Sequence, residues 1–192
     1  MFVLDLRVRP IKYLIIHHTA GNEANTQVIR NYHVNVNGWG DIGYHGVVER
    51  SGVIGVGRDV KYIGAHSLGR APGETLNMNH LGYGLSCIGN FETGIMSPIQ
   101  FDALVKEACR ICKLYNIPFE NIRRHSDDDS TSCPGKLFPW MNFLTEVNKV
   151  MKAVVSSDVD VYLSVRVRTS KKNMVIKQII DMGYACKELS LA

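Results

Sequence analysis

The stretch Tyr13–His18, with the sequence YLIIHH, decides the fold of this chain. It begins with four apolar or aromatic residues and ends in two adjacent histidines. A short apolar run of this kind is typical of a buried strand. We therefore predict a central strand over Lys12–His17, which carries a histidine to its C-terminal end.

Apolar residues at helical spacing predict three helices. The first begins near Asn25, where apolar residues follow at positions 28, 29, 32 and 36. The second begins at Ser97–Gln100, a capping box with proline at the first helical position. The third covers Phe138–Met151. Cys109 and Cys112 fall on the apolar face of the second helix, and we interpret them as core residues rather than as metal ligands.

Strand patterns occupy most of the remaining sequence. Tyr44–Glu49 and Val53–Val56 predict a hairpin, and Tyr83–Ile88 predicts another buried strand. Between them, residues 62–82 predict a long loop, and loops of that length in a compact domain tend to be functional. This order of elements predicts an α/β fold with a mixed central β-sheet flanked by helices.

Three residues far apart in the sequence are of the types that bind zinc. They are His17, His125 in the segment RHSD, and Cys133 in the segment SCPG. Each alone has an ordinary explanation, because a histidine at a strand end usually packs and a cysteine before Pro-Gly usually fills a turn. Together they provide three ligands, which leaves the open position of a catalytic rather than a structural zinc site.

Composition restricts the classes of partner. The net charge of +4 includes no Lys/Arg block, so we expect no nucleic-acid partner. No apolar run approaches the roughly 20 residues of a membrane span, so no stable membrane insertion is expected. The charged N-terminus does not have the pattern of a signal peptide. Together with an odd number of cysteines, five, this predicts reduced thiols in a cytosol.

The sequence predicts two domains, residues 1–155 and 156–192. In the second, Val161–Arg168 alternates like a half-buried strand, Lys171–Met182 has a helical pattern, and Tyr184–Leu191 is a second strand. A β-α-β unit of this size buries too little surface to fold alone. We expect it to dock on the first domain, on a second copy of itself as a homodimer, or on an external ligand. Leu4–Val8 alternates likewise and is expected to add a strand to this unit.

In their order and spacing, the sequence motifs resemble those of the zinc-dependent N-acetylmuramoyl-L-alanine amidases. This type-2 amidase family includes the peptidoglycan recognition proteins and the phage lysozymes of the amidase type. The resemblance covers about residues 11–152. The segments that carry it are Ile15–Ala20, Ile29–His33, Gly38–His45, Gly64–Ser67, Ile88–Glu92, Arg124–Asp127 and Ser132–Gly135.

The resemblance implies roles for individual residues. Spacing alone leaves open which of His17 and His18 binds the metal, and the family pattern places the ligand at His17, so that His18 packs or supports it. His125 and Cys133 complete the implied Zn²⁺ site. Tyr44 matches a catalytic tyrosine that can donate a hydrogen bond to the developing oxyanion.

The general base is left open by the resemblance. Thr131 stands where catalytic recognition proteins carry threonine and some phage members carry lysine, and its hydroxyl can orient water or the carbonyl. Cytosolic amidases that recycle wall fragments use a glutamate on the strand occupied here by Leu85–Cys87. Ser86 stands near that position.

Polar residues on segments that border the substrate groove of relatives are expected to bind substrate, each weighed against an ordinary loop role. They are His45, His66, Asn77, Asn79 and His80. Asp127–Asp129 is interpreted as an exposed acidic turn that at most steadies His125.

Three functions are compatible with these expectations. The first is a phage endolysin, made in the host cytoplasm and acting on peptidoglycan after release. The second is a non-catalytic peptidoglycan-binding module, and the third is a cytosolic muropeptide-recycling amidase. Non-catalytic relatives typically lose the ligand cysteine, and Cys133 is present here. The basic tail favours a wall-directed enzyme, so we predict an endolysin that hydrolyses the bond between N-acetylmuramic acid and L-alanine.

Overall fold

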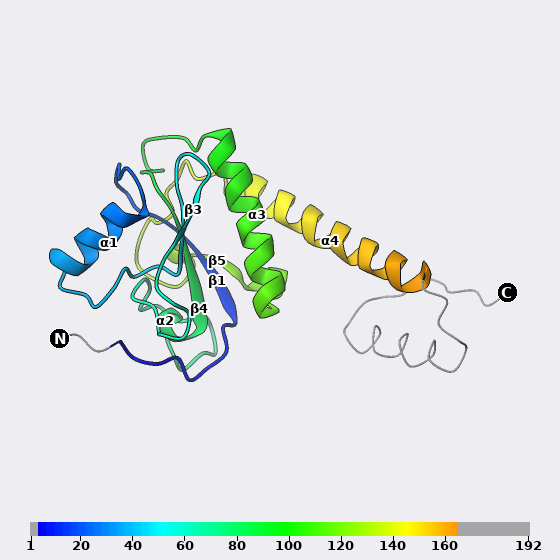
Figure 1. Ribbon diagram of the computed structural model, residues 1–192, viewed down its shortest axis with the longest axis horizontal. Coiled ribbons are helices and arrows are strands. Elements are labelled where there is room, and N and C mark those ends of the chain that lie inside the picture. The colour runs from blue at the N-terminus through cyan, green and yellow to red at the C-terminus, as the bar shows by residue number, and fades with distance from the viewer. Residues whose placement is uncertain (1–3, 165–192) are drawn as a thin grey trace. The chain divides into compact units, whose positions relative to one another are not determined.

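A five-stranded mixed sheet forms the centre of the fold (Figure 1). The computed structural model describes residues 4–164. The strand order is β3-β2-β4-β1-β5, in which only β3 runs antiparallel to its neighbour. The predicted α/β class with a mixed central sheet is confirmed. The strands are β1 (Tyr13–His18), β2 (Gly46–Val48), β3 (Ile54–Val56), β4 (Gly82–Cys87) and β5 (Ile122–Arg124).

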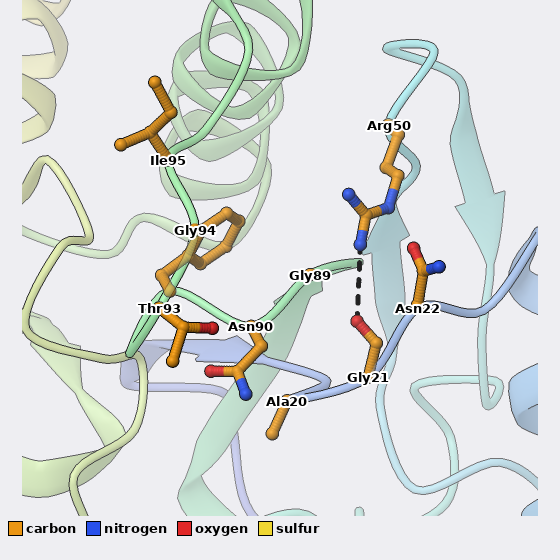
Figure 2. Close-up of a pocket in the computed structure, with 10 residues that line it drawn as sticks. Ala20, Gly21, Asn22, Arg50, Gly89, Asn90, Thr93, Gly94 and Ile95 are labelled. Carbon is orange, nitrogen blue, oxygen red and sulfur yellow. Dashed lines mark hydrogen bonds between the residues drawn. The ribbon is translucent and has the colours of Figure 1, made fainter.

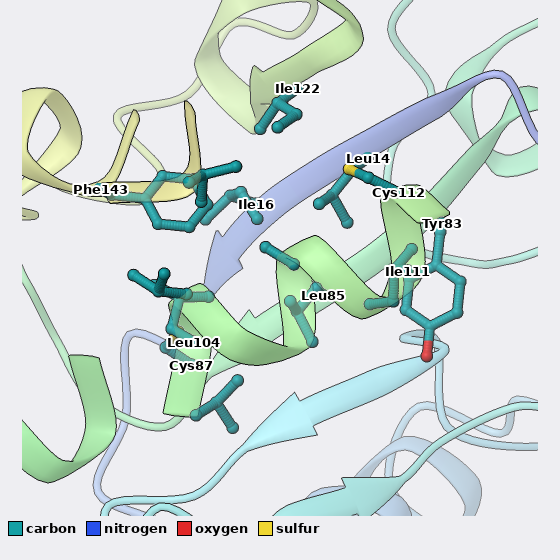
Figure 3. Packing of buried hydrophobic residues seen from close by; sticks show 14 of the residues in the cluster. Leu14, Ile16, Tyr83, Leu85, Cys87, Leu104, Ile111, Cys112, Ile122 and Phe143 are labelled. Carbon is teal, nitrogen blue, oxygen red and sulfur yellow. The ribbon is translucent and has the colours of Figure 1, made fainter. Parts of the chain in front are cut away.

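Side chains along β1 alternate between the two faces of the sheet. Leu14 and Ile16 are fully buried in the main core, where they meet residues of α3 (Pro98–Tyr115) such as Leu104 (Figure 3). Neighbouring strand residues point to opposite faces. His17 therefore points away from this core.

The helices begin close to where the sequence predicts. Asn25 caps α1 (Thr26–Asn35) by accepting a hydrogen bond from the Val28 N–H at 3.2 Å. Of the predicted apolar face of α1, however, only Ile29 is buried. Ile29 packs on Val47 of β2, so α1 and α3 cover opposite faces of the sheet (Figure 1).

Half of the predicted capping box of α3 is present. The Ser97 hydroxyl accepts from the Gln100 N–H at 3.3 Å. The Gln100 side chain does not return to the cap. It turns into the core and donates to the carbonyl oxygens of Val48 (3.0 Å) and Ile88 (2.9 Å), which gives its own buried N–H groups hydrogen-bond partners.

The segments before and within the long loop depart from prediction. Leu6 forms an antiparallel bridge with Tyr62, so the N-terminal segment pairs with this loop. The strands of the C-terminal unit to which it was predicted to add lie largely outside the described residues. The loop at residues 62–82 ends in a short helix, α2 (Met78–Leu81).

The C-terminal helix is longer than predicted. α4 covers Trp140–Ser164, so Val161–Ser164 is helical and the strand predicted from Val161 is wrong over these residues. Helix propagation from an existing turn costs little, which explains why the alternating pattern does not interrupt it. The rest of the predicted β-α-β unit lies outside the described residues. The chain divides into two compact units, Met1–Met151 and Lys152–Ala192, and the site described below belongs to the first.

No helix within residues 4–164 is both long enough and apolar enough to span a membrane. The four cysteines of this part of the chain are free thiols. Cys112 is buried in the main core, and Cys109 packs against it, which confirms their interpretation as core residues.

We expect Leu104→Ala to destabilise the protein, because it leaves a cavity between α3 and the sheet. The loss should be about 2–5 kcal/mol, measured by urea denaturation. Leu114→Ala on the same helix is the control: its side chain is 57% exposed, and its effect should stay within about 0.5 kcal/mol. Equal losses in both variants would contradict the packing described.

Candidate metal centre

His17, His125 and Cys133 converge at the C-terminal ends of β1 and β5. Their potential ligand atoms all lie within 4.8 Å of one another. The Cys133 sulfur lies 3.8 Å from Nδ1 of His17, and the two imidazole centroids are 4.5 Å apart. The structure therefore brings together all three residues predicted as ligands, and we call them the trio.

Sheet register explains this convergence. β5 runs parallel to β1, with Arg124 opposite Ile16, so His125 leaves β5 level with His17. The loop that follows folds back, since the Ser126 N–H donates to the carbonyl oxygen of Cys133 at 2.9 Å.

His17 and Cys133 are buried, and His125 is half-buried. Burial lowers the pKa of His17 well below its ordinary value of 6.5, and the neighbouring His125 lowers it further. A neutral imidazole is the form that binds a metal. Burial also raises the pKa of the Cys133 thiol to about 11, opposed by a hydrogen bond from the His18 N–H.

His18 lies on the other face of β1, as predicted. Its Nδ1 accepts a hydrogen bond from the Phe91 N–H at 3.1 Å. Its own N–H donates to the Cys133 sulfur at 3.3 Å. His18 therefore packs in the core and also helps to hold the cysteine.

Tyr44 lies beside the trio. Its ring centroid is 5.3 Å from that of His17. Burial, and then the nearby Cys133, raise the pKa of the Tyr44 phenol to about 12. The phenol is therefore protonated at neutral pH and can donate a hydrogen bond to an oxygen that gains negative charge.

Thr131 supports the cysteine loop. Its hydroxyl oxygen accepts a hydrogen bond from the Cys133 N–H at 3.2 Å. The hydroxyl proton is left to donate elsewhere. Ser86 is paired with His17 in the sheet register, and its buried hydroxyl has no hydrogen-bond partner among the described residues.

The five predicted substrate-binding residues fall into two groups. His45, His66 and Asn79 are buried, and His45 accepts a hydrogen bond from the Gly84 N–H at 3.0 Å. Asn77 occupies the position before α2 without a capping hydrogen bond from its side chain, and His80 lies within that helix. Contact of any of them with substrate stays a prediction.

The acidic run Asp127–Asp129 is only in part the exposed turn that the sequence predicts, since Asp127 is exposed but Asp128 and Asp129 are not. The Asp128 carboxylate is fully buried and pairs with Arg123 at 2.7 Å, and Asp127 pairs with Arg124 at 2.8 Å. Asp129 lies 2.9 Å from Nε2 of His125. Each carboxylate has its own partner because the turn after β5 folds back over the strand.

Two arginines near the site were missed by sequence reasoning. Arg58 donates to the backbone carbonyl oxygens of Asp41 and Ile42, which lead to Tyr44, and to that of Ile63. Arg7 reaches Nε2 of His45 at 2.9 Å, and burial lowers the Arg7 pKa to about 10. A single arginine in a loop carries no pattern by which its buried partners could be predicted. Arg7 also donates to the carbonyl oxygens of Val60, Tyr62, His80 and Gly82.

A pocket of about 400 Å³ opens at the C-terminal ends of the parallel strands (Figure 2). Ligands of open α/β sheets bind at such ends. Arg50, Asn22 and Asn90 offer hydrogen-bond donors to it, and the Arg50 guanidinium also donates to the carbonyl oxygen of Gly21 at 3.3 Å. The described lining includes none of the five predicted substrate-binding residues. It consists of Ala20, Gly21, Asn22, Arg50, Gly89, Asn90, Phe91, Thr93, Gly94 and Ile95.

Residues 7–136 match the family model described as N-acetylmuramoyl-L-alanine amidase. The chain belongs to this amidase family. The predicted resemblance is thereby confirmed, and the matched residues include the whole trio.

Relatives of this amidase-family chain include both recognition proteins and lytic enzymes. Peptidoglycan-recognition protein SC2 of Drosophila melanogaster is 31% identical over 149 residues, or 69% of this chain and 76% of that protein. The endolysin amidase LysCS of Clostridium intestinale URNW has a similar structure, with a TM-score of 0.65 and 30% identity over 76% of this chain and 88% of that one. A complex of peptidoglycan recognition proteins LCa and LCx with tracheal cytotoxin matches with a TM-score of 0.59 and 26% identity, over 72% of this chain and 84% of that one.

We expect the metal-free protein to lose stability as the pH falls below about 6.5. Burial lowers the pKa of His17, His45 and His66 in the folded state, so below 6.5 the unfolded chain binds more protons than the folded one. The free energy of unfolding should fall by about 1.4 kcal/mol per pH unit for each such histidine.

Urea denaturation in the presence of a chelator at pH 7.5, 6.5 and 5.5, at constant ionic strength, measures this slope. The stability contributed by the neutral histidines is present above pH 6.5 and is lost below it. An unfolding free energy that is constant or rises between pH 6.5 and 5.5 would show that these histidines are not buried in neutral form.

Proposed function

We propose that this chain is a zinc-dependent amidase that hydrolyses the bond between N-acetylmuramic acid and L-alanine in peptidoglycan. The convergence of His17, His125 and Cys133 carries this proposal. Membership of the amidase family and the similarity to an endolysin amidase support it.

The donor set of the trio fits zinc. Two imidazoles and one thiol are ligand types that zinc prefers, and three protein ligands are the number found in catalytic sites. When bound, zinc would supply Lewis acidity, which activates water as a nucleophile and polarises an amide carbonyl.

Residues around the trio would orient and stabilise the reacting groups. Tyr44 holds a protonated phenol 5.3 Å, ring to ring, from His17, and would donate a hydrogen bond to the carbonyl oxygen as negative charge develops on it. Thr131 would orient water or the carbonyl through its hydroxyl proton, since its oxygen already accepts from the Cys133 N–H.

A wall-directed setting is favoured over muropeptide recycling. Ser86 is the residue paired with His17 on β4, and a serine hydroxyl is a much weaker base than the glutamate that recycling amidases use on this strand. We therefore propose a phage endolysin that acts on the host wall after release from the cytoplasm. Wall binding or dimerisation through residues 156–192 stays part of this proposal.

Peptidoglycan is the proposed substrate. The relatives LCa and LCx bind tracheal cytotoxin, which supports a muropeptide ligand for this fold. The pocket beside Arg50 offers a positive charge that suits a carboxylate of the stem peptide.

Mass spectrometry of digested peptidoglycan, with and without a zinc chelator, tests the function. Release of stem peptides with a free N-terminal L-alanine, abolished by the chelator and restored by zinc, is expected. Tight wall binding without release of peptides would instead identify a recognition module, as in relatives that bind walls without cutting.

We expect Cys133→Ser to abolish hydrolysis and to weaken zinc retention, because it removes the thiolate ligand. Zinc content after dialysis and the rate of peptide release measure the two effects. Cys109→Ser, a change in a free cysteine of α3, is the control and should retain zinc. Full activity of metal-free Cys133→Ser would exclude the zinc mechanism.

Tyr44→Phe should retain zinc and lose activity by roughly 10²- to 10³-fold, because the donor to the developing oxyanion is removed. The rate of amide hydrolysis and the zinc content are measured together. Tyr32→Phe, on the exposed side of α1, should leave both unchanged. Activity of Tyr44→Phe within a factor of two of the unmodified protein would rule out this role.

A further inference from the structure

Two neighbouring loop residues support the histidines of the trio, His66 by direct contact with His17 and Ser67 through Asp129. Nδ1 of His66 lies 3.1 Å from Nε2 of His17. The Ser67 hydroxyl donates to Oδ2 of Asp129 at 2.7 Å, and the same oxygen lies 2.9 Å from Nε2 of His125. His66 and Ser67 therefore support both imidazoles from a single point of the loop.

One side chain fixes this part of the loop. Oδ1 of Asn79 accepts hydrogen bonds from the backbone N–H groups of His66 (2.6 Å) and Ser67 (2.9 Å). The Asn79 N–H also donates to the carbonyl oxygen of Ser67 at 3.0 Å. Since Asn79 belongs to α2, the two supporting residues are held against a helix.

Space is left for the His66 imidazole by two glycines. A Cβ atom on Gly64 would lie 2.4 Å from the imidazole, and one on Gly84 would lie 2.6 Å from it. Any other residue at either position would displace the ring. The backbone is therefore shaped to admit an imidazole beneath His17.

Burial of His66 has a cost that its contact with His17 explains. Nε2 of His66 is buried without a hydrogen-bond partner among the described residues. A buried polar group without a partner costs about 1–3 kcal/mol. An apolar ring at this position would avoid this cost. It would also lose the polar contact that Nδ1 of His66 makes with His17.

The atoms involved match the requirement of a metal-binding histidine. An imidazole that binds a metal through one nitrogen carries its proton on the other, and the partner of that proton fixes the tautomer and the ring orientation. Nδ1 of His17 faces the Cys133 sulfur at 3.8 Å, so Nε2 carries the proton toward His66. Nε2 of His125 is taken by Asp129, which leaves its Nδ1 for a metal.

We propose that His66, Ser67 and Asp129, clamped through Asn79, are positioning residues that fix the tautomer and orientation of both histidines of the trio. This assigns His66 and Asn79 a role other than substrate contact. It rests on the proposed zinc function, and it is tested by metal affinity rather than by activity alone.

The zinc dissociation constant, measured by competition with a chromophoric chelator, tests the role of His66. His66→Phe keeps a ring but removes the acceptor, and should weaken zinc binding about 10- to 100-fold. His66→Asn places an acceptor near the position of Nδ1 and should restore affinity to within a few-fold. A purely structural role of the ring predicts the opposite order of the two variants.

Variants of Ser67 and Asn79 test whether these residues support zinc binding together with His66. Ser67→Ala should weaken zinc binding by a similar factor, and its effect should multiply with that of His66→Phe, because the two act on different histidines. Asn79→Ala should weaken zinc binding as well. When it is combined with Ser67→Ala or with His66→Phe, the loss of affinity should be smaller than the product of the two separate losses. Ser97→Ala, at the cap of α3, is the matched control and should leave the dissociation constant unchanged.

A Co²⁺-loaded sample gives a second readout, since the visible absorption of the ion reports its coordination geometry. His66→Phe should change this spectrum and His66→Asn should preserve it. If the unmodified protein binds zinc and cleaves peptidoglycan while all these variants bind zinc equally well, the inference is overturned and the proposed function stands. If the unmodified protein binds no zinc, both are overturned.

Discussion

The parallel pairing of β1 with β4 and β5 is the constraint on which the site depends. Its register sets Ser86 beside His17 and places His125 one residue past the last paired position of β5. A shift of one residue would turn His17 into the main core and Ile16 toward the opposite face of the sheet, because side chains alternate along a strand. The apolar packing of Leu14 and Ile16 therefore also fixes the position of the proposed metal ligand.

Much of the fold could be predicted because its signals are local. The apolar runs of β1 and β4, the hairpin, and the caps of α1 and α3 are encoded within a few residues of where they act. The trio could be predicted from residue types and from the family resemblance. The inward orientation of the Gln100 side chain could not be predicted, because this side chain donates to the carbonyl oxygens of residues distant in the sequence.

The contacts of the polar residues around the trio also could not be predicted from the sequence. The sequence does not predict that His66 is buried against His17, or that the Asn79 side chain accepts from the His66 backbone N–H. Arg7 was assigned no role and is bound by backbone carbonyls beside His45. Such contacts depend on how a long irregular loop closes on the sheet, which no local pattern in the sequence encodes.

The trio also joins opposite ends of the domain. His17 lies in β1 and Cys133 follows β5. An ion bound to both would therefore close most of residues 7–136 into a single loop. Closure of a long loop removes conformational entropy from the unfolded chain. In a domain cut once within the loop at residues 62–82, the ion would then join the two fragments in addition to the pairing of β1 and β2 with β4, and removal of the ion would weaken their association.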